Sequence, residues 1–318
     1  MIEQNVIDVL KRYDELAGLI LEQKVDEFSD KMDEKPPEED DVTYEQYLQR
    51  VAMAETEEQS LLMEAEPQDA LGGKSMNEFF AGLSFEQLTE ILEFCATELD
   101  RGVPQSVVNA LVSVDDDAEV EAYARRIVND SAWREEEMEN EDALFEMEFQ
   151  KVKACLKILS GRRDASLIDD VLDRFMSYSQ THSFVADSIA EYIESFPEEA
   201  PSKLISRLEE HSDDGMEGPC EDLIVMLTNI GKEKKSDDIY NAIRLAFRSM
   251  KNKIYAVICF ADYGDARAIP MLKNYINRHQ SDISRDLFYE MMSAIQNLGG
   301  DIEDISDPFG DFQKKTDK

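Results

Sequence analysis

The stretch ADYGDARAIPML, residues 261–272, has the features of a junction between two helices. An apolar run ends at Gly264, and glycine readily adopts the left-handed backbone that closes a helix. Asp265 comes next and can accept hydrogen bonds from the free N–H groups of the following helix. Pro270 fits inside a helix only if that helix starts late or kinks. We therefore expect one helix to end at the glycine and a second to follow, late-starting or kinked at the proline.

Glycines that follow apolar runs recur along the chain at a nearly constant interval. Gly161, Gly231, Gly264 and Gly299 are separated by 70, 33 and 35 residues, and the middle of the longest gap falls at the apolar run broken by Phe196-Pro197. A helix-ending signal about every 35 residues is typical of stacked helical hairpins. No segment of useful length alternates apolar and polar residues with a strand bias, so the chain is expected to be all-α.

The helices expected between residues 143 and 300 form pairs. An apolar face that starts near residue 143 ends at Gly161. The first helices of the four following pairs are expected at about 165–178, 201–211, 236–250 and 266–279, and their second helices at about 183–196, 219–230, 253–263 and 283–298. The short connections predict antiparallel partners.

The junction resembles that of HEAT-like repeats, the class that includes the phycobilisome-lyase type. In that family a Gly-Asp turn ends one helix and an Ala-Ile-Pro-Leu type segment begins the next. A second copy reads LSGRRDASLIDDVL, residues 159–172, and a weaker third runs from Ile230 to Ile239. The resemblance implies a right-handed α-solenoid of antiparallel hairpins over residues 143–300. The residues given junction roles are Gly161, Asp164, Gly231, Gly264, Asp265, Arg267 and Gly299. Arg267 either reaches acids on an adjacent turn or stays solvated.

Three further regions complete the predicted organisation. Residues 1–73 form an acidic helical region with helices at 2–33 and about 44–64, and end in a Gly72-Gly73 linker. This region either caps the array or folds over its groove as a mobile module. Residues 74–142 are an irregular helical segment, and residues 301–318 an acidic tail.

The charge of the chain is strongly negative and uneven. The formal net charge is -38, of which residues 1–160 carry -27 and residues 161–318 carry -11. Such a field repels nucleic acid and anionic lipid and attracts basic proteins, which makes direct binding to nucleic acid or to a membrane unexpected. The other interpretation is that the acidity serves solubility alone.

The sequence offers little reactive chemistry. The four cysteines form no CxxC pair and are expected to be buried, reduced thiols of a cytoplasmic protein, since the N-terminus lacks signal-peptide features and no stretch is long enough to span a membrane. The three histidines lie near expected helix ends. No HExxH, phosphate-binding loop or nucleophile elbow occurs, so we expect no enzyme activity, no metal and no cofactor.

The second helices of such pairs usually line the inner face, where we expect the partner to bind. The residues expected to face outward are Asp187, Glu191, Tyr192, Tyr255, Asp262, Arg285, Tyr289 and Gln296. Tyr255 and Tyr289 lie 34 residues apart, about one repeat. Aromatic rings beside acids suit a basic peptide, whereas the alternative is a plain solvated face.

These observations support three hypotheses of function. The first is a non-enzymatic scaffold or adaptor that binds a basic protein on the concave face. The second is an acidic mimic of nucleic acid that occupies a DNA- or RNA-binding protein. The third is an enzyme related to repeat-type lyases.

Overall fold

The computed structural model describes residues 1–29, 44–115, 117–130, 142–177 and 183–311. Over these residues the protein is all-α, with fifteen α-helices, two short 3-10 helices and no strand. The one β-type contact among them is an isolated bridge between Gln68 and Lys74. The expected fold class is thereby confirmed at the level of an all-α protein.

The chain forms two compact units, Met1–Asp164 (unit 1) and Ala165–Lys318 (unit 2). The boundary expected after residue 73 therefore lies inside unit 1. The expected array, residues 143–300, contains the division between the two units. Its first helix packs against earlier helices of unit 1.

Unit 1 contains seven α-helices and one 3-10 turn among its described residues. These are α1 (Gln4–Ser29), α2 (Tyr44–Ala65), η1 (Asp69–Leu71), α3 (Met76–Phe80), α4 (Phe85–Glu98), α5 (Gln105–Val112), α6 (Asp117–Asp130) and α7 (Asp142–Gly161). α1 pairs with α2, while α7 packs on α4, α5 and α6. A capping box begins α4, since the Ser84 hydroxyl accepts from Gln87 N–H and the Gln87 side chain accepts from Ser84 N–H. Thr43, which directly precedes α2 and is of a residue type that often caps helices, lies outside the described residues.

A buried carboxylate from α2 holds the N-terminus of α5. Glu64 is 1% exposed, and its two oxygens accept hydrogen bonds from Gln105 N–H at 3.1 Å and Ser106 N–H at 2.5 Å. The hydroxyl of Tyr13 in α1 donates to the same carboxylate at 2.8 Å. A negative charge at a helix N-terminus satisfies free N–H groups and complements the helix dipole. The Glu64 side chain thus links α1, α2 and α5 in one hydrogen-bonded group.

The other end of α5 is held by a cation. The guanidinium of Arg162, just beyond α7, donates to the carbonyls of Leu111 at 3.1 Å, Val112 at 2.7 Å and Val114 at 3.1 Å. Cations stabilise the carbonyl-rich C-terminus of a helix. The short α5 therefore has charged partners of opposite sign at its two ends.

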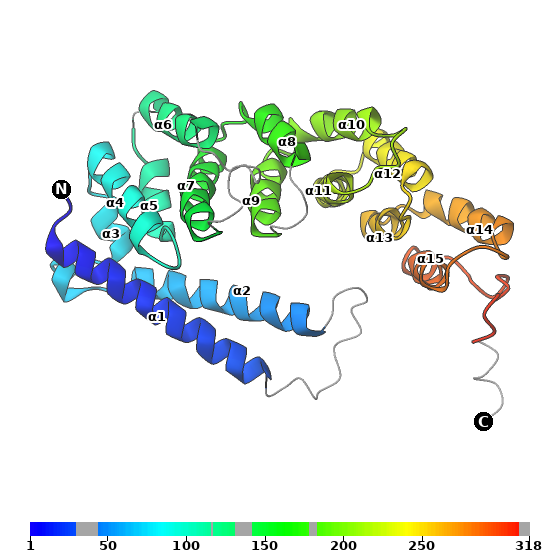
Figure 1. The fold of residues 1–318 in the computed structure, drawn as a ribbon, viewed down its shortest axis with the longest axis horizontal. Coiled ribbons are helices and arrows are strands. Elements are labelled where there is room, and N and C mark those ends of the chain that lie inside the picture. The colour runs from blue at the N-terminus through cyan, green and yellow to red at the C-terminus, as the bar shows by residue number, and fades with distance from the viewer. Residues whose placement is uncertain (30–43, 116, 131–141, 178–182, 312–318) are drawn as a thin grey trace. The chain divides into compact units, whose positions relative to one another are not determined.

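Unit 2 consists of four helix pairs in two rows (Figure 1). The first helices are α8 (Ile168–Ser177), α10 (Ala200–Glu210), α12 (Asp237–Ser249) and α14 (Ile269–Arg278), and the second helices are α9 (Ser183–Glu194), α11 (Pro219–Glu233), α13 (Ile254–Tyr263) and α15 (Arg285–Asn297). Each helix contacts its pair partner, and the second helices contact one another in the order α9, α11, α13, α15. The helix positions expected from the sequence are confirmed to within a few residues.

Ion pairs connect successive helix pairs of unit 2. Lys203 pairs with Asp169, Arg207 with Asp173, and Lys251 with Glu217 at 2.9 Å; each of these partners lies 34 residues away in the sequence. Farther along, Arg267 pairs with Asp237 at 2.7 Å and Lys273 with Asp304 at 2.6 Å. The near-constant offset places equivalent positions of neighbouring pairs next to each other.

The four expected junction glycines fall into two classes. Gly264 and Gly299 have φ values of 67° and 81°, and Gly264 closes α13 as expected. Gly161 and Gly231 instead lie within the last turns of α7 and α11, so their expected left-handed role is wrong. After α7 the left-handed position belongs to Arg163, with φ of 61°.

Close helix packing explains the two helical glycines. A Cβ atom on Gly161 would lie 2.7 Å from Val112 Cγ2, and one on Gly231 would lie 2.7 Å from Tyr263 Cε2. Any side chain at these positions would collide with a neighbouring helix.

The three polar junction residues make different contacts. The Asp265 carboxylate accepts from Arg267 N–H at 2.9 Å, which confirms its capping role. Arg267 reaches Asp237 and stacks 4.2 Å from the Tyr240 ring, so it contacts an adjacent turn. Asp164 is 8% exposed and pairs with Nε of Arg125 at 2.6 Å.

The proline in the last junction behaves as its ring geometry requires. A 3-10 turn, η3 (Ala266–Ala268), precedes α14, and Pro270 occupies the first turn of that helix. The helix therefore starts late, as expected.

Candidate partner-binding surface

Tyr192, expected to face outward on α9, is buried. Its side chain is 1% exposed and its ring packs edge-on against Phe196 with centroids 5.1 Å apart. The expectation is corrected because Tyr192 falls in the stripe of α9 that faces the core, four residues after the buried Ser188. The neighbouring Asp187 and Glu191 are exposed, as expected.

Two expected surface residues of α15 are engaged by the segment that follows the helix. The Asp311 carboxylate accepts from Arg285 at 2.8 Å and from the Tyr289 hydroxyl at 2.7 Å. The ring of Phe309 lies against those of Phe288 and Tyr289. Tyr289 is therefore half-buried beneath this segment, while Gln296 stays exposed near the end of α15. Of the two tyrosines expected to line one open groove, Tyr255 is exposed and Tyr289 is partly covered.

Asp262 at the end of α13 is exposed and pairs with Lys232 of α11 at 3.0 Å. The nearby Glu194 of α9 accepts from the Asn229 amide at 2.9 Å, and its pKa is raised, chiefly because burial disfavours the charged form. Hydrogen bonds and ion pairs between neighbouring helices thus occupy the carboxylates at this end of the row.

The opposite, N-terminal ends of the same helices present a different surface. It comprises Asp187 of α9, Glu221, Asp222 and Val225 of α11, and Tyr255 of α13, and is called the acidic surface of unit 2. α11 contacts both α9 and α13, which brings the three helices together. Tyr255 and Val225 are each 38% exposed, among the few large apolar side chains of unit 2 that reach solvent in the described residues.

The pKa values of Asp222 and Tyr255 are raised by burial and by neighbouring acids. The pKa of Asp222 is raised by burial first and by the negative charge of Asp187 second. The pKa of Tyr255 is raised by burial and then by the charges of Glu221 and Asp222. Like charges held together raise one another's pKa because each disfavours the ionised form of the next. A cation placed here would relieve that repulsion.

Sequence reasoning identified Asp187 and Tyr255 but missed Glu221, Asp222 and Val225. The missing signal was available in the helical spacing. Asp222 and Val225 are three residues apart and Glu221 and Val225 four apart, so they share one face of α11. The opposite face holds the fully buried Leu223 and Leu227.

The described residues show little reactive chemistry. All four cysteines are buried and free, and burial raises their pKa values, to about 11 for Cys220 and about 12 for Cys259. Two histidines lie near acids, His211 near Asp214 and His279 near Asp282, while His182 is outside the described residues. No group of three potential metal ligands occurs in the part of the chain that the structure covers.

None of the helices within the described ranges combines the length and the apolar character needed to cross a membrane. Compared with protein-family models, with curated proteins and with solved structures, the chain finds no match in any of the three.

Proposed function

We propose that the chain is a non-enzymatic protein-binding scaffold of the cytoplasm, and that the acidic surface of unit 2 binds a basic segment of a partner protein. Unit 2 would form a right-handed α-solenoid of HEAT-like hairpins. Support for this architecture comes from the two rows of paired helices, the late-starting helix at Pro270, and the ion pairs at an offset of 34 residues. Such arrays typically bind extended partners over successive repeats.

The observation that carries the proposal is the position of Tyr255 beside Glu221 and Asp222. An exposed ring next to carboxylates suits an arginine, which stacks on the ring face while its N–H groups donate to the acids. Val225 adds an apolar contact for the stem of the same side chain. The pKa of Asp222 is raised first by burial and second by the charge of Asp187, so a cation bound here would interact with two acids in a partly buried setting.

Mimicry of nucleic acid has less support. A mimic needs rows of carboxylates open to a DNA- or RNA-binding protein, yet many acids of unit 2 pair with lysines and arginines of the neighbouring helix pair. The lyase-like alternative has no specific observation in its favour, since the four thiols are buried in the helical core.

The proposal is tested by the affinity of a fluorescent 12-residue peptide of alternating arginine and glycine. Anisotropy is measured with the full chain at low and at physiological salt. The double variant Asp222→Asn/Tyr255→Ala should weaken binding roughly 30- to 700-fold, because it removes a charge-assisted hydrogen bond worth about 1.5–3 kcal/mol and a stacking contact worth about 0.5–1 kcal/mol.

The matched control is Asp286→Asn, which removes one exposed carboxylate from the first turn of α15. Its affinity should stay within twofold of the original. Equal weakening by both variants would mean that the peptide responds to net charge alone, and the acidic surface of unit 2 would not be its site.

A further inference from the structure

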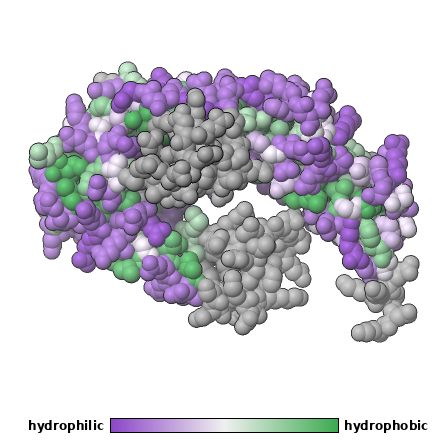
Figure 2. Space-filling view, viewed as in Figure 1, coloured by the Kyte–Doolittle hydropathy of each residue, from purple (hydrophilic) through white to green (hydrophobic). Residues whose placement is uncertain are grey.

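Exposed apolar side chains gather on the first two helices of unit 1. Across the described residues, most large apolar side chains that reach solvent belong to α1 or α2, namely Leu16, Leu19, Val25, Met53, Leu61 and Leu62. Figure 2 shows green, hydrophobic atoms among the purple ones where this pair lies. Single exposed apolar residues are ordinary, but a concentration on one element marks an interaction site.

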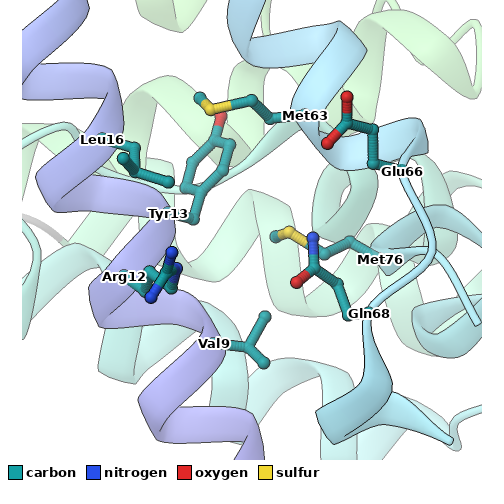
Figure 3. A pocket seen from close by; sticks show the side chains of 8 residues that line it. All are labelled: Val9, Arg12, Tyr13, Leu16, Met63, Glu66, Gln68 and Met76. Carbon is teal, nitrogen blue, oxygen red and sulfur yellow. The ribbon is translucent and has the colours of Figure 1, made fainter. Parts of the chain in front are cut away.

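A cavity of about 60 Å³ opens between α1 and the end of α2. Its apolar floor includes Val9 and Met76, which are 8% and 1% exposed. The exposed Arg12, Leu16 and Glu66 stand at its rim. Figure 3 shows the side chains of α1 on one side of this space and Met63, Glu66, Gln68 and Met76 on the other.

Two exposed leucines extend this cavity into a groove. Leu19 lies three residues after Leu16 on α1, and Leu62 lies four residues before Glu66 on α2. Residues three or four apart occupy the same face of a helix, so both leucines continue the rim along the helix pair. They are 54% and 55% exposed. The cavity lining together with Leu19 and Leu62 is called the α1–α2 groove.

Exposed acids surround the groove. Glu15 and Glu22 stand one turn before and after Leu19, and Glu58 stands one turn before Leu62. Glu66 adds a fourth carboxylate at the rim, against the single cation of Arg12. This charge disfavours a second copy of the chain, whose net charge is also -38, and an anionic lipid surface.

The size of the cavity limits what it can hold. Pockets for drug-sized ligands run to about 300–1,000 Å³, so a cavity of about 60 Å³ suits the end of one side chain. An amphipathic helix presents such side chains at intervals of three or four residues and binds grooves through them.

We propose that the α1–α2 groove binds a basic amphipathic helix of a partner protein, with one apolar side chain of that helix in the cavity. Leu16, Leu19 and Leu62 contact the rest of its apolar face. Its lysines or arginines meet the acids at the rim. This site is separate from the acidic surface of unit 2, and either can exist without the other.

The probe is an 18-residue peptide of leucine and lysine, with leucines at helical spacing. Its control is a peptide of the same composition in scrambled order. Binding to the full chain is measured by calorimetry, and the mass of the chain by light scattering. The variants are Leu19→Ser/Leu62→Ser, Glu15→Lys/Glu58→Lys, and Asp286→Asn as the control in unit 2, outside both proposed binding surfaces. All substituted side chains are exposed, so the helices should persist, and circular dichroism checks that they do.

We expect the ordered peptide to bind at least tenfold more tightly than the scrambled one. Each double variant should weaken the binding of the ordered peptide at least tenfold, while Asp286→Asn should change its affinity less than twofold. Equal binding of the two peptides, or unchanged affinity in both double variants, would overturn the proposal. So would a dimer of the unmodified chain that Leu19→Ser/Leu62→Ser converts to a monomer.

Discussion

The substitution Gly231→Ala tests the packing between α11 and α13. The added Cβ would lie 2.7 Å from Cε2 and 3.1 Å from Cδ2 of Tyr263, and 3.0 Å from Cγ2 of Ile239. Tyr263 cannot swing away at low cost, because its hydroxyl accepts from Ser236 N–H at 2.8 Å and donates to Ser236 C=O at 2.9 Å. The ring is 1% exposed and closely packed. One added methyl group therefore disturbs the junction of three helices.

Two opposing effects set the magnitude. Alanine is favoured over glycine within a helix by about 0.8–1.0 kcal/mol. Overpacking of a well-filled core costs about 1–3 kcal/mol, and displacement of the Tyr263 hydroxyl loses hydrogen bonds worth about 1 kcal/mol each. With one of these hydrogen bonds lost, the unfavourable effects exceed the helix gain by about 1–3 kcal/mol, so Gly231→Ala should destabilise unit 2 by that amount.

Each unit carries its own pair of buried thiols, which allows the two to be assayed separately. Cys95 and Cys155 report on unit 1, and Cys220 and Cys259 on unit 2. Under native conditions a thiol reagent labels a buried cysteine only when its surroundings open, so the labelling rate follows the opening equilibrium. A loss of about 1.4 kcal/mol corresponds to a tenfold faster rate. We expect that increase at Cys220 and Cys259, with the unit 1 thiols unchanged.

The matched control is Gly18→Ala in α1. The added Cβ would come no closer than 3.7 Å to Nη2 of Arg101, and the backbone at Gly18 has ordinary helical geometry. This substitution should stabilise unit 1 by about 0.5–1 kcal/mol and slow the labelling of Cys95. Slower labelling of Cys259 in Gly231→Ala would refute the reasoning, because it would show that the helix gains more from alanine than the packing loses.

Three further outcomes follow from the structure. Glu64→Ala should lower the free energy of unfolding of unit 1 by about 3 kcal/mol, because two backbone N–H groups of α5 lose a charged acceptor. Urea unfolding measures this loss, and a value below about 1 kcal/mol would contradict the role of Glu64 in holding α5. Burial raises the pKa of Glu194 and of Asp222 above their ordinary 4.5 and 3.8, so the folded form binds these protons more tightly than the unfolded form. The stability of unit 2 should therefore fall as pH rises above about 4 through the raised values, and a rise over that window would contradict this sign. After protease cleavage near Gly72, residues 1–73 should co-elute with the remainder in gel filtration, whereas their release would support a mobile module.

Helix positions in unit 2 could be predicted because the apolar spacing and the junction signals act locally. The helix expected at about 253–263 is α13 (Ile254–Tyr263), and the closing glycine at its end needs no distant partner. The short α3 (Met76–Phe80) was missed because five residues are too few to show a period. Its start does carry a local signal, the capping box of Ser75 and Glu78.

Features that depend on tertiary contacts were harder to predict from the sequence. Glycine occurs both where the backbone turns left-handed and where helices approach closely, and only the neighbouring helix decides between them, as Gly264 and Gly231 show. Tyr192 was expected at the surface together with Asp187 and Glu191, although it lies three residues after the buried Ile189. Nothing near Glu64 in the sequence indicates that it caps a helix some forty residues later.

The two charged partners of α5 determine how short a fragment of unit 1 can be and still fold. A fragment starting at residue 74 would remove Glu64 and leave the buried N–H of Ser106 without its acceptor. A fragment ending at residue 161 would remove Arg162 and uncover the carbonyls of Leu111 and Val112. Trimming either end of the unit thus weakens the same central helix. The early and late segments of unit 1 should consequently fold and unfold together.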